Sequence, residues 1–313
     1  MLPPMNLPAW IISLPLLAAV VTVVLPGTGR WVGIFSAIIN LLVVVKLCVE
    51  ILVHGALQMQ VGGWQAPVGI QLYADGLSAA MLAISAIVLA CSTFYARSYF
   101  SGKAASRSFW PLWMFLWAAL NALFLSADIF NLYVTLELLG LSAVALVALS
   151  QTADGLSAAM RYLLVSLTGS LSYLMGVALV YAANGTLSLK MLATAGPASP
   201  SLSTAFALMA AGLIMKSALF PMHFWLPPAH ANAPAPVSAV LSALVVKASF
   251  YILLRLWLMV FEPFLNPSTA QIVGMLGAFA VIWGSVQALL AKRLKLLVAY
   301  STVAQIGYLF LIF

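Results

Sequence analysis

Long apolar runs follow one another along almost the whole chain, and this pattern constrains the fold more than any other feature. A helix needs about 20 apolar residues to cross roughly 30 Å of hydrocarbon. Lipid offers no partners for backbone N–H and C=O groups, so each such run must be helical. We therefore predict an all-α polytopic membrane protein with about ten transmembrane helices. The runs are residues 8–25, 31–53, 76–98, 109–127, 129–149, 158–182, 203–224, 237–261, 269–290 and 294–313.

The scarcity of charge supports a membrane protein. Among 313 residues, 13 are basic and 6 are acidic, whereas a soluble chain of this length would carry on the order of 78 charged residues. The net charge of +7 does not indicate nucleic-acid binding, because the longest basic cluster is KRLK at 292–295 and the other basic residues are isolated. Cys48 and Cys91 lie inside apolar runs, and two cysteines at that spacing do not predict a disulfide framework or a metal site.

The basic residues predict an orientation. The first 29 residues contain no Lys or Arg, so a cleavable signal peptide is not expected and the N-terminus is predicted outside. Lys190 then lies outside, whereas eight basic residues lie at inner connectors, as the positive-inside rule requires. Residues 55–75 are interpreted as a small hairpin on the outer face. The eight inner residues are Arg30, Arg97, Lys103, Arg107, Arg161, Lys292, Arg293 and Lys295.

Three charged residues lie within predicted spans, where a charge costs about 2.5–3.5 kcal/mol on insertion scales. They are Glu137, Lys216 and Lys247, and none has an opposite charge three or four residues away on its own helix. Each needs a partner on another helix or in water. A proton or ion path through the bundle is one interpretation, and an interhelical salt bridge that fixes packing is the other; three such charges favour the path.

Other charged residues have simpler explanations. Lys46 and Glu50 are spaced i, i+4 and can neutralise one another. Asp75 and Asp128 lie at the edges of spans, where helix N-caps are expected. Arg255 is expected to extend toward the membrane interface.

The segment FPMHFWLPPAHANAPAPVS at 220–238 contains five prolines between two apolar runs, so no continuous helix can include it. Broken backbone at membrane depth is tolerated only where it is buried in protein or lines a wet cavity. His223 and His230 lie on this segment. They are interpreted either as a proton relay or as hydrogen-bonding groups that hold the broken backbone; two histidines alone do not predict a metal site.

Several of these motifs resemble those of one family, the antiporter-like proton-conducting membrane subunits. Such subunits occur in respiratory complex I, in Mrp-type cation/proton antiporters and in membrane-bound hydrogenases. The motifs are DGLSAAM at 75–81, DIFNLYVTLELLGL at 128–141, FPMHFWLPPAHANAPAPVSAVLSALVVKASFYILLR at 220–255 and LKLLVAYSTVAQIGYL at 294–309.

The resemblance implies a role for each buried group. Glu137 corresponds to the glutamate of the fifth helix, and Lys216 to the lysine of the broken seventh helix with which that glutamate pairs. Lys247 corresponds to the lysine of the eighth helix, and His223 and His230 to the histidines of the linking segment.

The resemblance also implies a bundle of two inverted five-helix repeats, with the second repeat incomplete. On this basis residues 1–107 hold helices one to three, residues 108–261 the first half-channel repeat, and residues 262–313 the start of the second. Two features depart from the family pattern. Pro228 replaces a common acidic residue, and the charged residue of the twelfth helix is absent. Either the sequence is a fragment or a partner supplies the remaining helices.

The predicted function is that of a proton-translocating subunit of a multi-subunit complex, with cation/proton antiport as a variant of it. The alternatives are a non-conducting structural subunit and an independent solute transporter. The expected partners are other membrane subunits, the lipid bilayer and protons, with sodium left open, and no nucleic acid. No cofactor, metal or catalytic motif is expected, so in a redox-driven, NADH-quinone oxidoreductase-like translocase the electron chemistry would belong to other subunits. The predicted location is a bacterial or archaeal plasma membrane, or an organellar inner membrane. The type of complex and the driving reaction stay open.

Overall fold

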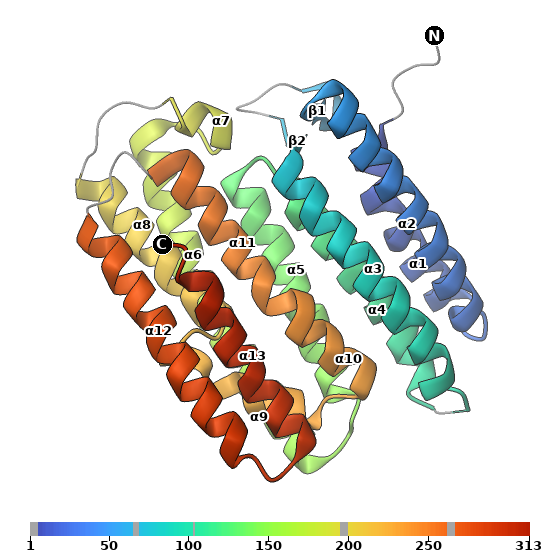
Figure 1. Cartoon of the computed structure of the whole chain (residues 1–313). Helices are drawn as coiled ribbons and strands as arrows, with labels where there is room; N and C mark the ends of the chain where they lie inside the picture. Colours follow the sequence, from blue (N-terminus) through green and yellow to red (C-terminus); the bar gives the residue numbers. More distant parts are fainter. Residues whose placement is uncertain (1–5, 65–68, 103, 195–199, 262–266) are drawn as a thin grey trace. The chain divides into compact units, whose positions relative to one another are not determined.

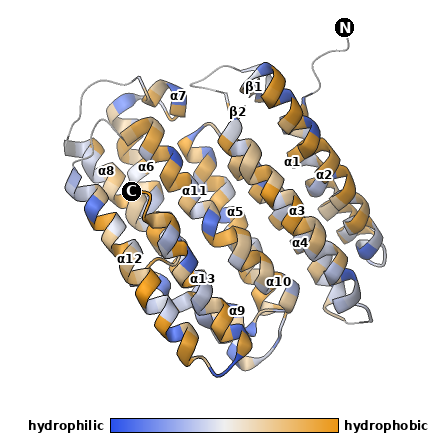
Figure 2. Cartoon of the chain, in the orientation of Figure 1, coloured by the Kyte–Doolittle hydropathy of each residue, from blue (hydrophilic) through white to orange (hydrophobic). Residues whose placement is uncertain are grey.

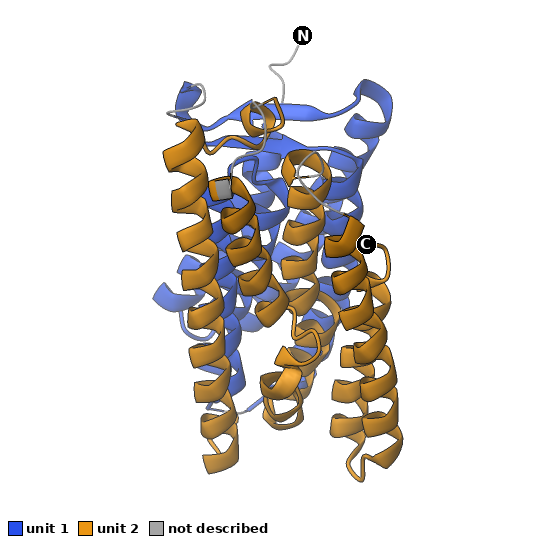
Figure 3. Ribbon diagram, turned by 90° about the vertical axis from the view of Figure 1, so that its left-hand side faces the viewer, with its two compact units in different colours: residues 1–149 blue, residues 150–313 orange. Residues whose placement is uncertain are grey.

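The computed structural model describes residues 6–64, 69–102, 104–194, 200–261 and 267–313 (Figure 1). In these ranges eight helices are long and apolar enough to cross a membrane, and two further apolar helices, Ser201–Lys216 and Leu294–Phe310, are shorter. Together they correspond to the ten predicted spans, so the polytopic helical fold is confirmed. The chain forms two compact units, residues 1–149 and 150–313, which Figure 3 colours separately. Each unit is described by itself.

The first unit contains five long helices and one hairpin. The antiparallel strands β1 and β2 pair Leu57 with Ala74 and Gln60 with Gln71, which confirms the predicted hairpin; residues 65–68 lie outside the described residues. The backbone N–H of Ala127 donates to the carbonyl of Gln71, so the hairpin lies beside the connector between α4 and α5. The elements are α1 (Leu7–Val24), α2 (Gly29–His54), β1 (Leu57–Gln60), η1 (Val61–Gly63), β2 (Gln71–Ala74), α3 (Gly76–Tyr99), α4 (Ser106–Leu125) and α5 (Ile129–Ala148).

A proline in α1 explains a buried polar cluster in this unit. Pro15 has no N–H, so the carbonyl of Ile11 loses its partner in the helix. The side-chain amide of Asn40 on α2 donates to this oxygen at 3.0 Å, and that of Asn121 on α4 donates to it at 2.8 Å. Both asparagines are fully buried. Three helices are therefore joined at one carbonyl that lipid could not satisfy.

The predicted N-caps are confirmed. The Asp75 carboxylate accepts the backbone N–H of Ser78 at the start of α3. The Asp128 carboxylate accepts two backbone N–H groups at the start of α5, those of Phe130 and Asn131. Burial raises the pKa of the Asp128 carboxyl, while these two hydrogen bonds act in the opposite direction.

The second unit contains the remaining helices. Its first helix, α6, is longer than the predicted run 158–182. The seventh span is shorter than predicted, because α8 ends at Lys216 rather than near residue 224. The elements are α6 (Ala153–Asn184), α7 (Leu189–Leu192), α8 (Pro200–Lys216), η2 (Met222–Trp225), α9 (Leu226–Asn232), α10 (Ala235–Val240), η3 (Leu241–Val245), α11 (Val246–Leu256), η4 (Trp257–Phe261), α12 (Pro267–Leu290) and α13 (Leu294–Phe310).

Glycines allow α6 and α8 to pack with their backbones close together. A Cβ atom on Gly212 of α8 would lie 3.1 Å from the backbone nitrogen of Tyr173 and closer still to the carbonyl oxygen of Gly169, both on α6. A Cβ on Gly176 would lie 2.6 Å from the carbonyl of Ala205. Small residues at a helix contact are typical of membrane bundles, where close van der Waals packing replaces the hydrophobic effect.

Apolar residues cover the helices along their length (Figure 2). Leu52 is 85% exposed and Leu289 is 86% exposed, and both lie on long helices. Side chains of this kind on such helices face lipid or other membrane subunits rather than water.

Two expectations about charged residues need correction. The Glu50 carboxylate forms an ion pair with His54 at 2.9 Å, so the predicted pairing with Lys46 is wrong for that carboxylate. Arg255 does not extend to an interface: it is only 4% exposed, and its guanidinium donates twice to the Tyr251 hydroxyl, at 3.0 and 2.7 Å. The nearby hydroxyl lies one turn earlier on the same helix, which makes burial possible.

Candidate functional site

The site begins where α8 ends. Lys216 is the last residue of α8 and is only 7% exposed. Its aliphatic stem lies against α6, since a Cβ on Gly169 would be 3.1 Å from its Cγ. α8 has 17 residues, about 25 Å at 1.5 Å per residue, which is less than the roughly 30 Å of hydrocarbon in a bilayer. The ammonium group therefore belongs to a helix end, where exposed carbonyl dipoles favour a positive charge.

The chain leaves the helix immediately after Lys216. Ala218 has φ of 56°, the left-handed region that non-glycine residues rarely adopt. The predicted break is thus confirmed, and it begins at Ser217–Ala218, before the first proline of the segment. The indole N–H of Trp225 donates to the carbonyl of Met215 at 3.0 Å and satisfies one group of the interrupted helix. The Trp225 ring stacks on Tyr162 of α6, with ring centres 4.3 Å apart.

His230, on the short helix α9, is fully buried. Its Nδ1 atom lies 2.7 Å from the hydroxyl oxygen of Ser238 on α10. Its Nε2 atom is buried and has no hydrogen-bond partner among the described residues. A buried ring nitrogen without a partner carries a desolvation cost of about 1–3 kcal/mol. A water molecule, which can donate or accept a proton, is the natural partner for it.

Lys247 is half-buried on α11 and bonds to a widened turn of its own helix. Its ammonium donates to the carbonyl of Ser242 at 2.7 Å. Ser242 lies in η3, where the backbone adopts π-helical bonding and frees carbonyls from the usual α-helical pattern. The Ser242 hydroxyl lies 2.6 Å from that of Thr302 on α13, which extends the polar cluster to a third helix.

Lys295 also belongs to this cluster, although the sequence interpretation assigned it to a cytoplasmic connector. It is the second residue of α13, and its ammonium donates to the carbonyl of Ala233 at 2.5 Å. Ala233 lies between α9 and α10, where the backbone is broken a second time. The charges of Lys295 and Lys247 both act on the His230 imidazole. The residue's place within KRLK concealed this role.

His223 is half-buried on η2, and its Nδ1 atom is buried without a partner among the described residues. The imidazole stacks against Phe220, with ring centres 5.6 Å apart. It lines a cavity of about 290 Å³, together with residues of α9, α12 and α13. The lining residues are Phe224, Pro227, Pro228, Trp283, Gln287, Leu296 and Tyr300.

Four of the five predicted site residues lie in the second unit. Lys216 and His223 flank the first break of the segment, and His230 lies with Lys247 and Lys295 around the second. Glu137 is half-buried on α5 in the first unit. Within the described ranges, no group of three or more His, Cys, Asp or Glu residues is arranged to hold a metal ion. The arrangement suits proton transfer between lysine, histidine and water rather than metal chemistry.

Residues 126–313 match the family described as NADH:quinone oxidoreductase/Mrp antiporter, transmembrane. The chain belongs to this family. The match covers α5 and the whole second unit, and therefore contains all five predicted site residues.

Individual proteins extend the family match toward the N-terminus. NADH-quinone oxidoreductase subunit N of Desulforudis audaxviator is 37% identical over 258 residues, which cover 80% of this chain and 51% of that protein. An Na(+)/H(+) antiporter subunit of Alkalihalophilus pseudofirmus is 29% identical over 284 residues, covering 90% and 57%. The chain thus spans about half the length of these curated relatives.

A solved structure shows the same fold. A chain of the membrane-bound sulfane sulfur reductase, an archaeal respiratory membrane complex, matches with a TM-score of 0.93 and 28% identity. The match covers 97% of this chain and 64% of that one. The antiporter-like membrane fold expected from the sequence motifs is confirmed, and the chain is an integral membrane protein.

Proposed function

We propose that this chain is a proton-translocating membrane subunit of a multi-subunit complex. The observation that carries the proposal is the series of buried ionisable groups on interrupted backbone in the second unit. Lys216 ends one helix, His230 lies between two breaks with an unpartnered Nε2, and Lys247 bonds to a π-helical turn. Broken helices of this kind mark ion paths in transporters.

The relay uses Lys216 as its central proton carrier. Burial favours the neutral amine and a nearby carboxylate favours the ammonium form. A displacement of Glu137 relative to Lys216 would therefore load or unload the proton, and each tenfold change in proton affinity corresponds to about 1.4 kcal/mol. Lys247 would take the proton next, with His223 and His230 beside the water path between the two lysines. Sodium coupling would make the same subunit a cation/proton antiporter.

The test uses the complex assembled with its native partner subunits in liposomes. Glu137→Gln and Lys216→Ala are each expected to abolish most proton transport without loss of assembly. Lys190→Ala is the matched control for Lys216→Ala, because Lys190 is exposed on α7 and lies away from the broken segment. Normal transport by an assembled Lys216→Ala complex would overturn the relay and favour a non-conducting structural subunit.

We further propose that the N-terminus lies outside a bacterial or archaeal plasma membrane. The eight-to-one distribution of basic residues supports this orientation. A single cysteine at the exposed position Ala104 should resist an impermeant reagent applied outside, and one at the exposed position Gln60 should react. The reverse labelling pattern would overturn the orientation.

A further inference from the structure

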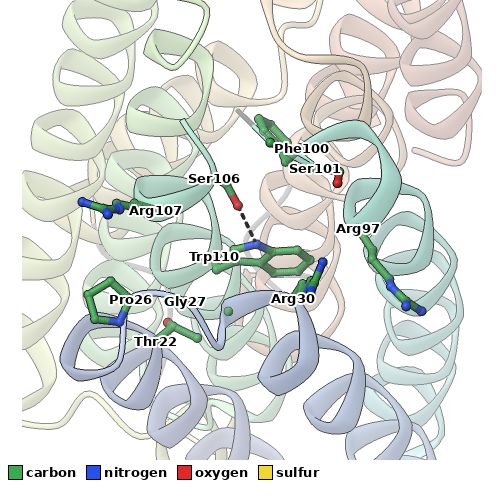
Figure 4. Close-up of a pocket in the computed structure, with 12 residues that line it drawn as sticks. Thr22, Pro26, Gly27, Arg30, Arg97, Phe100, Ser101, Ser106, Arg107 and Trp110 are labelled. Atoms are coloured by element: carbon green, nitrogen blue, oxygen red, sulfur yellow. Dashed lines mark hydrogen bonds between the residues drawn. The ribbon is translucent and has the colours of Figure 1, made fainter. Parts of the chain in front are cut away.

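Three arginines surround a cavity at one end of the first unit. Arg30 is the second residue of α2, Arg97 lies in the last turn of α3, and Arg107 is the second residue of α4. The cavity has a volume of about 260 Å³, and its lining contains no Asp or Glu. Figure 4 shows Trp110 in the middle of the cavity, with Arg107 on one side and Arg30 and Arg97 on the other.

The positive charges of this cavity are not neutralised by the protein. The guanidinium carbons of Arg30 and Arg97 lie 5.5 and 4.6 Å from the centre of the same ring, that of Trp31. In the described part of the chain none of the three arginines forms an ion pair. Like charges held around one ring repel one another. An anion between them would remove that repulsion, and guanidinium groups match phosphate by paired hydrogen bonds.

Two helices begin at the same place without a side-chain cap. Neither Thr28, before α2, nor Ala105, before α4, accepts a backbone N–H through its side chain. In the same unit, α3 and α5 begin away from the cavity and are capped by Asp75 and Asp128. The two uncapped helix starts add to the positive potential of the arginines and favour an anionic ligand.

An apolar cavity adjoins the charged one and indicates the chemistry of the rest of the ligand. It has a volume of about 480 Å³ and shares Thr22, Pro26 and Arg107 with the first cavity. Its other lining residues are mainly apolar: Val23, Ser108, Pro111 and Leu112. A free phosphate would occupy the charged cavity alone. A charged head beside an apolar tail would occupy both.

We propose that these two cavities bind one anionic phospholipid. Arg30, Arg97 and Arg107 hold its phosphate, and the beginning of an acyl chain lies against Val23 and Leu112. The cavities lie where α1 and α3 end and α2 and α4 begin, which is the depth of the lipid head groups. Basic pockets between transmembrane helices bind such head groups in other proteins. This site belongs to the first unit and does not depend on the proposed proton relay.

The experiment measures binding of phosphatidylglycerol and phosphatidylcholine to the purified full chain in detergent by native mass spectrometry. We expect the wild type to prefer phosphatidylglycerol. Arg97→Gln/Arg107→Gln should weaken phosphatidylglycerol binding by about tenfold or more, since each basic residue near an anionic head group contributes about 1 kcal/mol. Both side chains are exposed, so their replacement leaves the packing of the unit intact.

The matched control removes two exposed basic residues elsewhere. Lys292→Gln/Arg293→Gln alters the connector between α12 and α13 and should leave phosphatidylglycerol binding unchanged. An equal loss in both double variants, or no preference over phosphatidylcholine, would overturn the site. Inorganic phosphate at millimolar concentration tests the other source. Complete displacement of phosphatidylglycerol by phosphate would show that free phosphate is the ligand and would overturn the lipid.

Discussion

The Nδ1 atom of His230 lies 2.7 Å from the hydroxyl oxygen of Ser238, while the Nε2 atom of the same ring is buried without a partner in the described structure. The hydroxyl can donate to Nδ1 or accept from it, so it decides which nitrogen carries the proton. A fixed tautomer and ring orientation are needed if Nε2 exchanges a proton with water.

We predict that Ser238→Ala lowers both stability and proton transport. The loss of a partner for a buried ring nitrogen should cost about 1–3 kcal/mol, measured by thermal unfolding of the purified chain. Ser238→Thr keeps the hydroxyl and should restore transport in the assembled complex. Ser142→Ala is the control, because that buried hydroxyl bonds only to carbonyls of its own helix. Unchanged transport by Ser238→Ala would exclude a role of this hydroxyl in the relay.

Ala218 offers a test of the backbone break after Lys216. Its φ of 56° costs an L-residue about 1–2 kcal/mol, and glycine avoids that cost. Ala218→Gly should therefore leave the free energy of unfolding unchanged or raise it. Ala210→Gly, inside α8, should lower it by about 1 kcal/mol because glycine is a poor helix former. Equal destabilisation by the two substitutions would contradict the left-handed conformation.

The close contact of α6 and α8 predicts opposite effects of alanine at two helical glycines. Gly212→Ala places a Cβ against the backbone of α6 and should destabilise the chain by about 1–3 kcal/mol. Gly274→Ala, on α12, meets no atom within 4 Å and should stabilise its helix by up to about 1 kcal/mol. Unfolding midpoints of the two variants in the same detergent provide the comparison. A tolerated Gly212→Ala would mean that the two helices can separate freely.

Lys295 and Lys292 are close in sequence but differ in structure. Lys295→Met removes a charged hydrogen bond to the carbonyl of Ala233 and should cost about 1.5–3 kcal/mol. Because the charge of Lys295 acts on His230, the same variant should also change proton transport in the assembled complex. Lys292→Met alters an exposed residue and should change neither property. Identical behaviour of the two variants would return Lys295 to the role of a connector residue.

Sequence predicted the helices well because the thickness of hydrocarbon imposes a nearly fixed length on each apolar run. The caps at Asp75 and Asp128 were equally predictable, since a short acidic side chain before an apolar run has few other uses there. The roles of Glu137, Lys216, Lys247, His223 and His230 stay predictions. So does the division into segments 1–107, 108–261 and 262–313, which depends on a repeat.

Other features had no local signal. Prolines marked the broken segment, but the break begins at Ala218, whose conformation no neighbouring residue predicts. The π-helical turn at Leu241–Val245 has the composition of an ordinary helix. Arg255 reached burial through a tyrosine one turn earlier, and Lys295 through a carbonyl 62 residues away. Such partners follow from tertiary packing.

The carbonyl of Ile11 has a consequence for how the protein is made. During synthesis α1 enters the membrane first, with one backbone oxygen that Pro15 leaves unbonded. Asn40 becomes available when α2 follows, whereas Asn121 arrives 110 residues after Ile11. The first helix therefore reaches its final hydrogen bonding only after α4 has been inserted. A ribosome-bound chain that ends before α4 should hold α1 loosely, and one that includes it should lock the helix in place.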